Sequence, residues 1–481
     1  MIRTEEFMMD VSQPFHMLID GELVSAGARL PVINPADEQV FAHAPDCSRE
    51  QLDRAVAAAR RAFPAWRAVP IEQRRALLEQ FAPRVEAARD ELAALLTREQ
   101  GKPLAFAQLE FNSLLRFMEG QCKLTFPQEV VNEDTPQRRS ITRRVPLGVV
   151  AALAPWNFPA LLAWWKVIPA LLTGNTVVLK PSPLTPLTVL RIAELLADVL
   201  PPGVINVVSG GDDLGPWLSA HDGVDKVSFT GSTETGRRVM AGAAPTLKRL
   251  TLELGGNDAA IVLPDADVEA LIPSLFWAAF TNSGQVCVAA KRLYVHRDRY
   301  DAVRDGLIAY AKDVVVGPGA DPRSQLGPIQ NARQYRRVLD LIDETRRAGL
   351  KICFQGKVPD GPGYFVPVTL VDNPPEDARV VVEEAFGPVL PILRYDSIDE
   401  VVERVNASPY GLAGSIWGRD ETLAAQVAER IGSGTVWINE SMYLSPDVPF
   451  AGHGQSGVGI EHGVEGMLAC TEPQTITIRR N

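Results

Sequence analysis

The sequence is poor in cysteine and has an excess of acidic over basic residues, and these features exclude several classes of protein. Its five cysteines are scattered, odd in number and never form a CxxC pair. We therefore expect neither a disulfide framework nor a zinc site, and we favour a reducing, cytoplasmic compartment. The six histidines form no HxH or HExxH pattern, so no metal site is predicted. The formal net charge of −11 provides no long-range attraction to nucleic acid or to an anionic membrane.

Long apolar runs are also missing. The most apolar stretch, residues 145–179, is interrupted by prolines and a glycine, which argues against a membrane span. Residues 1–10 carry three acidic side chains and lack the basic and apolar regions of a signal peptide, so we expect no export signal. The one basic cluster, residues 138–144, is interpreted as a solvated or subunit-contacting strand rather than a nucleic-acid site.

The chain has enough apolar residues for more than one core. With 481 residues, of which 46% are hydrophobic, it exceeds the size at which a single core stops growing, and we expect two or more domains. Ser48 is a plausible cap for a helix that begins there. From residue 145, short β-rich runs alternate with helical spacing, and this order predicts a parallel sheet covered by helices. We expect strands at 148–153, 176–180, 204–209, 225–230 and 247–254, and helices at 160–172, 187–200, 267–283 and 330–348.

Two fragments carry residues suited to covalent catalysis. Cys287 lies in SGQVCVAAKR (283–292), and Glu253 lies in LELGGN (252–257). A thiol and a carboxylate, each beside glycine, can serve as nucleophile and general base in one site. Either fragment alone is equally typical of a buried, inert thiol or of a strand that ends in a turn.

Two further strings change this balance. PWNFP (155–159) lies upstream and EEAFGP (383–388) lies downstream. In this order, the four strings resemble the non-acylating aldehyde dehydrogenase superfamily, and the resemblance extends from about residue 18 to residue 478.

The resemblance implies a fold with two Rossmann-like, doubly wound α/β domains and a small β element for oligomerisation. Residues 1–123 and 147–255 would form an NAD(P)-binding domain, and residues 256–455 a catalytic domain. Residues 124–146 and 456–481 would form an oligomerisation or bridging segment in a homodimer or homotetramer. This segment includes the expected strands 140–145 and 475–479, for which two ordinary edge strands are the alternative.

The implied activity is NAD(P)-dependent oxidation of an aldehyde to a carboxylic acid. Cys287 would add to the carbonyl and carry a thioester, as the thiolate is the best side-chain nucleophile near neutral pH. The Asn157 amide and the Cys287 backbone N–H can form an oxyanion hole, and Glu253 can activate water for hydrolysis. Lys166 and Glu461 match family positions proposed to tune that base or relay its proton, although each could equally be a solvated charge.

A further string indicates an anion-binding turn. Residues 229–236 read FTGSTETG, which predicts a strand end, a glycine turn and a helix start where backbone N–H groups converge. The glycine spacing is GxxxxG rather than GxGxxG, so this string is a weak signal alone. The resemblance implies that it binds the pyrophosphate of NAD. The cofactor positions implied in the same way are Trp156, Lys180, Ser182, Pro183, Gly211, Phe229, Gly231, Ser232, Leu254, Glu384 and Phe386.

Pro183 departs from the family pattern. Many NAD-preferring relatives carry glutamate here, three residues after the lysine that corresponds to Lys180. Its absence removes a hydrogen bond to the ribose 2′-hydroxyl and a repulsion against a 2′-phosphate. NAD is the expected cofactor, and use of NADP stays possible.

The substrate is a small-molecule aldehyde whose identity the sequence does not name. The matched tunnel positions are nearly all apolar and include no arginine that could pair with an acid group, so they suggest an apolar aliphatic or aromatic aldehyde. Ordinary core packing is the alternative for any one of them. They are Phe158, Leu162, Trp165, Val286, Met442, Leu444 and Phe450. In the adjoining loop, Ala451 replaces the usual glycine and Gly454 the common lysine, so we expect the entrance or the packing of the loop to differ from that of relatives.

Two other functions are compatible with the resemblance. An acylating relative would pass the acyl group to coenzyme A, but such proteins often lack the general base that Glu253 would supply. A catalytically silent member with a binding role would typically have lost the nucleophile, whereas Cys287 is present.

Overall fold

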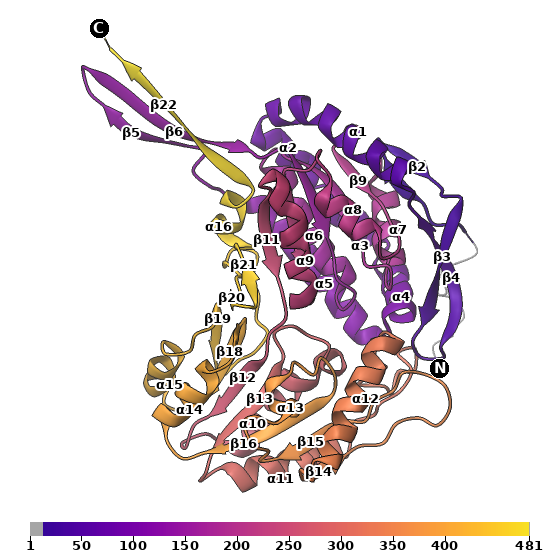
Figure 1. Cartoon of the computed structure of the whole chain (residues 1–481), viewed down its shortest axis with the longest axis vertical. Coiled ribbons are helices and arrows are strands. Elements are labelled where there is room, and N and C mark those ends of the chain that lie inside the picture. The colour runs from indigo at the N-terminus through magenta and orange to yellow at the C-terminus, as the bar shows by residue number, and fades with distance from the viewer. Residues whose placement is uncertain (1–12, 481) are drawn as a thin grey trace.

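The computed structural model describes residues 13–480 and contains two large sheets, each flanked by helices (Figure 1). Their strand orders are β2-β1-β9-β8-β7-β10-β11-β21 and β14-β15-β16-β13-β12-β18-β19. The predicted α/β architecture with two Rossmann-like domains is therefore confirmed. The expectation for residues 1–10 concerns a segment outside the described residues. Among those described, no helix is both long and apolar enough to cross a membrane.

The first sheet has five adjacent parallel strands, from β9 through β8, β7 and β10 to β11. Strands β1 and β21 extend its two ends in antiparallel fashion, and β2 pairs with β1. The strand bounds are β1 Met17–Ile19, β2 Glu22–Val24, β7 Val149–Leu153, β8 Thr176–Lys180, β9 Ile205–Val207, β10 Lys226–Thr230, β11 Arg249–Glu253 and β21 Gly457–Val458.

Helices cover both faces of this sheet. Along β7, alternate side chains enter two separate apolar cores, as expected for a parallel strand buried on both faces. One core packs against α4–α7, and the other against α1, α8 and α9. The helix bounds are α1 Arg49–Ala68, α2 Ile71–Leu78, α3 Phe81–Ala87, α4 Arg89–Gln100, α5 Leu104–Lys123, α6 Pro159–Leu172, α7 Leu187–Leu196, α8 Leu214–Ala220 and α9 Thr233–Ala243.

The second sheet is parallel except for its edge strand β14. Its two faces also contribute to separate cores. Its strands are β12 Asp258–Val262, β13 Ala290–His296, β14 Ile352–Gln355, β15 Thr369–Asp372, β16 Val389–Tyr395, β18 Ala413–Trp417 and β19 Thr435–Ile438. The associated helices are α10 Val268–Phe280, α11 Tyr300–Ala311, α12 Ala332–Arg347, α13 Arg379–Val382, α14 Ile398–Asn406 and α15 Glu421–Ala428.

Smaller elements complete the fold. A three-stranded antiparallel arm projects from the body and ends near the C-terminus (Figure 1). It consists of β5 Glu129–Asp134, β6 Arg138–Pro146 and β22 Thr471–Arg479, so the two strands expected outside the βα alternation are confirmed. The remaining elements are the pairs β3 Ala28–Asn34 with β4 Gln39–Asp46 and β17 Tyr410–Gly411 with β20 His453–Gly454, and the helix α16 Gly463–Leu468.

Helix starts follow the sequence pattern more closely than helix ends. Ser48 is confirmed as the cap of α1: its Oγ accepts the Gln51 N–H at 3.1 Å, and the Gln51 side chain accepts the Ser48 N–H at 3.0 Å. In contrast, α7 ends at Leu196 rather than at residue 200. Two prolines follow at positions 201 and 202, and the residue before a proline disfavours helical geometry.

A buried ion pair fixes the start of α6. Lys102 Nζ lies 2.5 Å from Glu110 Oε2, and both side chains are fully buried. Glu110 Oε1 accepts the backbone N–H groups of Ala160 and Leu161 at 3.1 and 3.2 Å. Lys102 also donates to the Asn157 carbonyl at 2.9 Å. The pair therefore holds the loop that carries the expected oxyanion residue.

Replacing Glu110 with glutamine should destabilise the protein, because Lys102 would remain buried without its counter-charge. Breaking a buried ion pair on one side costs about 3–5 kcal/mol. We expect the free energy of unfolding to fall by roughly that amount, measured as a shift of the urea midpoint at constant slope.

The matched control is Glu234→Gln, which removes the exposed partner of Arg238. Exposed pairs contribute about 0–1 kcal/mol, so its midpoint should stay near that of the parent protein. Equal shifts in the two variants would contradict the role assigned to the buried pair.

Candidate active site

Cys287 lies in a strained loop between a short 3₁₀ turn, Thr281–Gly284, and β13. Asn282, Ser283 and Gly284 have φ values of 52°, 57° and 76°, and this left-handed geometry is unfavourable for the two residues that carry a Cβ. A Cβ on Gly284 would overlap the carbonyl of Gly387. The nucleophile loop therefore packs directly on the backbone of the EEAFGP string.

Asn157 joins this loop from the other domain. Its Nδ2 donates to the Gln285 carbonyl at 3.0 Å, and Asn282 Nδ2 donates to the Asn157 carbonyl at 3.2 Å. The residue is 4% exposed. The structure thus brings the PWNFP string against the segment that ends in Cys287, as a site shared by thiol and amide requires.

The surroundings of Cys287 oppose its ionisation. The residue is partly buried and is not in a disulfide. Burial raises the pKa of its thiol to about 12, and the carboxylates of Asp258, Glu384 and Glu253 act in the same direction. Lys291 is the group that lowers this pKa.

Glu253, the last residue of β11, is buried and makes no side-chain hydrogen bond with the described residues. It is 3% exposed, and neither carboxylate oxygen has a hydrogen-bond partner within the described part of the chain. Burial raises its pKa well above the ordinary value, Glu461 adds to that shift, and Lys166 opposes it. This environment favours the neutral acid over the carboxylate.

Lys166 and Glu461 form an ion pair on the same side of the sheet. Lys166 Nζ lies 2.6 Å from Glu461 Oε1 and 2.7 Å from Thr230 Oγ1. Thr230 pairs with Glu253 across β10 and β11. Burial works against ionisation of Glu461, but Lys166, His462 and Ser228 together outweigh it and the pKa of Glu461 is lowered. Glu461 therefore favours its ionised form, whereas Glu253 favours its neutral form.

Two of the groups in this network had no assignment from the motifs. Ser228 Oγ donates to Glu461 Oε1 at 3.1 Å, and Thr230 accepts from Lys166. Their signal was the period-two spacing along β10, which places residues 228 and 230 on one face of the sheet.

Glu384 meets the glycines that follow Glu253. The Gly256 N–H donates to Glu384 Oε1 at 3.2 Å, and a Cβ on Gly255 would overlap the same carboxylate. The rings of Trp156 and Phe386 pack edge to face with centroids 5.3 Å apart. The PWNFP string with Trp156 thus contacts the EEAFGP string, which carries the two other expected cofactor positions, Glu384 and Phe386.

The turn after β10 leads directly into the N-terminus of α9. The Gly231 N–H donates to the Glu253 carbonyl at 3.0 Å, and a Cβ on Gly231 would overlap the Phe229 ring. Ser232 caps α9. Leu254 fills the space beside Gly236, where a Cβ would overlap its side chain. The N-terminus of α9 therefore lies against β11 with its positive dipole end near the site.

Lys180 ends β8 with its side chain buried. Its Nζ donates to the adjoining Pro181 carbonyl at 3.1 Å. Burial lowers the pKa of Lys180 to about 8, and Asp212 and Asp46 oppose that shift. The Ser182 hydroxyl accepts the N–H of Leu184 in the turn that follows.

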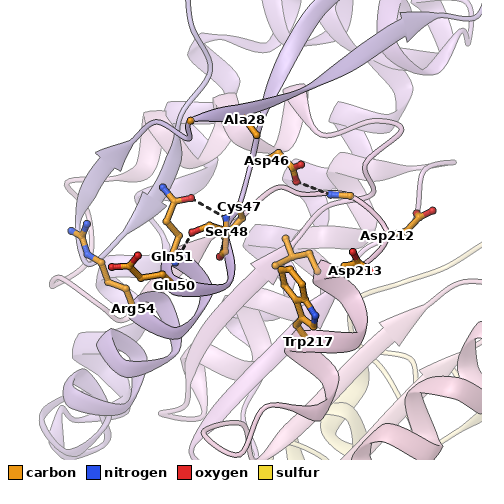
Figure 2. Close-up of a pocket in the computed structure, with 13 residues that line it drawn as sticks. Ala28, Asp46, Cys47, Ser48, Glu50, Gln51, Arg54, Asp212, Asp213 and Trp217 are labelled. Atoms are coloured by element: carbon orange, nitrogen blue, oxygen red, sulfur yellow. Dashed lines mark hydrogen bonds between the residues drawn. The ribbon is translucent and has the colours of Figure 1, made fainter.

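Gly211 borders an open cavity of about 630 Å³ between α1 and α8. Figure 2 shows Asp46, Asp212 and Trp217 around it. The Gly211 N–H donates to Asp46 Oδ1 at 3.1 Å. Of the expected site residues, only Gly211 lines this cavity, and Cys287 does not.

Five of the seven expected substrate positions belong to one apolar cluster around Cys287: Phe158, Val286, Met442, Leu444 and Phe450. Leu162 and Trp165 belong to the neighbouring core, which Phe158 and Leu444 also contact. The Trp165 and Phe450 rings, whose centroids lie 6.4 Å apart, connect this core with the cluster around Cys287. The motifs assigned no substrate role to five other contributors, which are Val288, Ala289, Leu412, Ala413 and Trp437.

The family model described as the aldehyde dehydrogenase family matches residues 23–476. A probable aldehyde dehydrogenase from Pseudomonas sp is 45% identical, with 98% of this chain and 96% of that protein aligned. The phenylacetaldehyde dehydrogenase of Pseudomonas fluorescens is 40% identical over 97% and 96% of the two chains.

Solved structures agree with the sequence comparisons. Betaine aldehyde dehydrogenase from Staphylococcus aureus in complex with NAD+ is 32% identical and superimposes with a TM-score of 0.95 over 99% of this chain and 97% of that one. An aldehyde dehydrogenase from Bacillus cereus, 36% identical, gives a TM-score of 0.95 over 98% of both chains. The chain with this thiol, amide and carboxylate between two Rossmann-like sheets belongs to the aldehyde dehydrogenase family.

Proposed function

We propose that the enzyme oxidises an apolar aldehyde to the free carboxylic acid with NAD, through a thiohemiacetal and then a thioester on Cys287. The observation that carries this proposal is the meeting of the Cys287 loop with Asn157, through the hydrogen bond of Asn157 to the Gln285 carbonyl. Glu253 supplies the base for hydrolysis, and its effect on the pKa of Cys287 is consistent with its proximity.

In the acylation half, the Cys287 thiolate adds to the aldehyde carbonyl. One Asn157 N–H is engaged by Gln285, and the amide carries a second that can donate to the oxyanion together with the Cys287 backbone N–H. The Lys102 ammonium holds the Asn157 carbonyl, so the amide is oriented before substrate arrives.

The cofactor positions fit a dinucleotide. Gly231 and Gly255 let the Phe229 ring and the Glu384 carboxylate pack closely on the backbone, and the α9 N-terminus can receive a pyrophosphate. We assign Glu384 to the nicotinamide ribose and Lys180 to the adenosine ribose. NAD, when bound, accepts the hydride of the aldehyde. The NAD+ in the structure of the Staphylococcus aureus relative supports this assignment.

In the deacylation half, Glu253 removes a proton from the water that attacks the thioester. A neutral Glu253 must first lose its own proton, because only the carboxylate is a base. The charged Lys166 and Glu461 adjoin it, and we assign to this pair the stabilisation or relay of that proton.

The apolar cluster around Cys287 supports an aliphatic or aromatic aldehyde. The members of this cluster other than Cys287 have apolar side chains, so a substrate carboxylate buried among them would find no partner within the cluster. The phenylacetaldehyde dehydrogenase relative favours an aromatic side chain.

Assembly through the projecting arm is part of the proposal. Val130, Val131, Ile476 and Ile478 are exposed on its strands, and apolar side chains in such a position are typical of a subunit contact. We propose a cytoplasmic homodimer or homotetramer, with a cofactor domain of residues 1–123 and 147–255, a catalytic domain of residues 256–455, and a bridging segment of residues 124–146 and 456–481.

Cys287→Ala should abolish aldehyde-dependent formation of NADH while leaving the affinity for NAD nearly unchanged, because only the nucleophile is removed. An aldehyde panel, with NAD(P)H absorbance measured with and without coenzyme A, provides the assay. Cys353→Ala, which removes another partly buried free thiol, is the matched control. Turnover retained by the Cys287 variant would exclude covalent catalysis, and turnover only with coenzyme A would indicate an acylating enzyme.

Glu253→Gln should separate the two half-reactions. Acylation needs the thiolate, whereas deacylation needs the base, and general-base removal commonly costs about 10²–10⁴-fold in rate. We expect slow turnover and an acyl adduct on Cys287 in the intact-protein mass spectrum after treatment with aldehyde and NAD. An unmodified mass under these conditions would contradict the assignment of Glu253 as the hydrolytic base.

Pro183→Glu should reduce use of NADP much more than use of NAD. The new carboxylate can accept the ribose 2′-hydroxyl, and it would repel a 2′-phosphate, a like-charge contact that costs several kcal/mol at interfaces. The measurement is the ratio of kcat/KM values for the two cofactors. Pro201→Glu, in the turn before β9 and so at the opposite end of the parallel strands, should leave the ratio unchanged. The same ratio in both variants would mean that residue 183 does not face the adenosine ribose.

A further inference from the structure

Lys291 is a buried cation within the active-site loop that the proposed mechanism does not use. It is the second residue of β13 and is 5% exposed. Its side chain turns back toward the preceding loop. Nζ donates to the Val286 carbonyl at 2.9 Å and to the carbonyl of Cys287, and it lies 3.4 Å from Glu384 Oε1.

These contacts connect the nucleophile to the cofactor side of the site. The carbonyls belong to Cys287 and the residue before it, and the carboxylate belongs to the residue proposed to bind the nicotinamide ribose. The same carboxylate is held by the Gly256 N–H. A lysine that served only to neutralise Glu384 would not need both loop carbonyls, which satisfy its remaining N–H groups and fix its charge beside the thiol.

We infer that Lys291 is a positioning residue that holds the Cys287 backbone in place and supplies the positive charge that promotes ionisation of the Cys287 thiol. This inference rests on the proposed function only in giving the thiolate a catalytic use. None of the other residues in the proposed mechanism promotes ionisation of the Cys287 thiol.

The charges around Cys287 support the inference. Burial raises the pKa of the thiol, and three carboxylates, those of Asp258, Glu384 and Glu253, raise it further. Lys291 alone among the groups that act on this thiol lowers its pKa. Removing the lysine would therefore leave a buried thiol without the one cation that lowers its pKa, and the thiolate would become still less accessible.

The test is the rate of alkylation of Cys287 by iodoacetamide, which follows the thiolate fraction and needs neither aldehyde nor cofactor. Rates are measured between pH 7 and 10 by peptide mapping for the parent, Lys291→Gln and Lys291→Arg. The matched control is Lys351→Gln, which removes a lysine that forms a 2.6 Å ion pair with Asp372 beside the edge strand of the same sheet.

At pH 8, alkylation of Cys287 in Lys291→Gln should be about tenfold slower or more, because below the thiol pKa each unit of increase lowers the thiolate fraction tenfold. Arginine keeps the charge, so Lys291→Arg should retain a rate within about threefold of the parent. The Lys351 variant should match the parent. Far-UV circular dichroism and the melting temperature show which variants are folded.

An unchanged rate in folded Lys291→Gln would overturn the inference. If that variant does not fold, the arginine variant decides: a parent-like rate supports the inference, and a tenfold loss in a folded arginine variant overturns it. The outcome is distinguishable from failure of the proposed function. Turnover by Cys287→Ala would exclude the covalent mechanism, whereas the alkylation rates report the ionisation of the thiol in either case.

Discussion

The site depends on how buried charge is compensated where the two sheets meet. Glu253 has no hydrogen-bond partner among the described residues and is only 3% exposed, and an isolated carboxylate in such a place is costly. It therefore favours the neutral form, while Lys166 and Glu461 compensate one another within 2.6 Å. Either partner of that pair alone would leave an uncompensated charge next to the base, so the three residues act as one unit.

Two glycines of the motifs allow neighbouring loops of the site to pack closely against each other. Gly255 leaves space for the Glu384 carboxylate, and Gly284 lets the nucleophile loop lie on the backbone of Gly387. A Cβ at Gly255 would separate the Glu253 string from Glu384, and a Cβ at Gly284 would separate the Cys287 loop from Gly387. The three strings were recognised as separate motifs, yet in the structure the EEAFGP string occupies the space that the glycines of the other two leave.

Local patterns predicted the elements, and the long-range contacts were beyond them. The strand 176–180 and the α1 cap at Ser48 follow from alternation and from the capping rule, because both depend on neighbours within a few residues. The ion pair of Lys166 with Glu461 joins residues 295 positions apart, and no local spacing encodes it. Its members were identified only by resemblance, and Ser228, which also contacts Glu461, was not identified.

Charge also affects the interpretation of Pro183. The absence of the family glutamate at this position removes a repulsion against the 2′-phosphate of NADP. However, Asp46 and Asp212 both act on Lys180, raising its pKa against the effect of burial, and both line the adjoining cavity. Negative charge within range of the Lys180 ammonium also lies within range of an anion bound to it, and like charges repel. These two carboxylates lie outside the motif, so they can oppose a 2′-phosphate even where the motif lacks its glutamate. The proposed preference for NAD therefore does not rest on residue 183 alone.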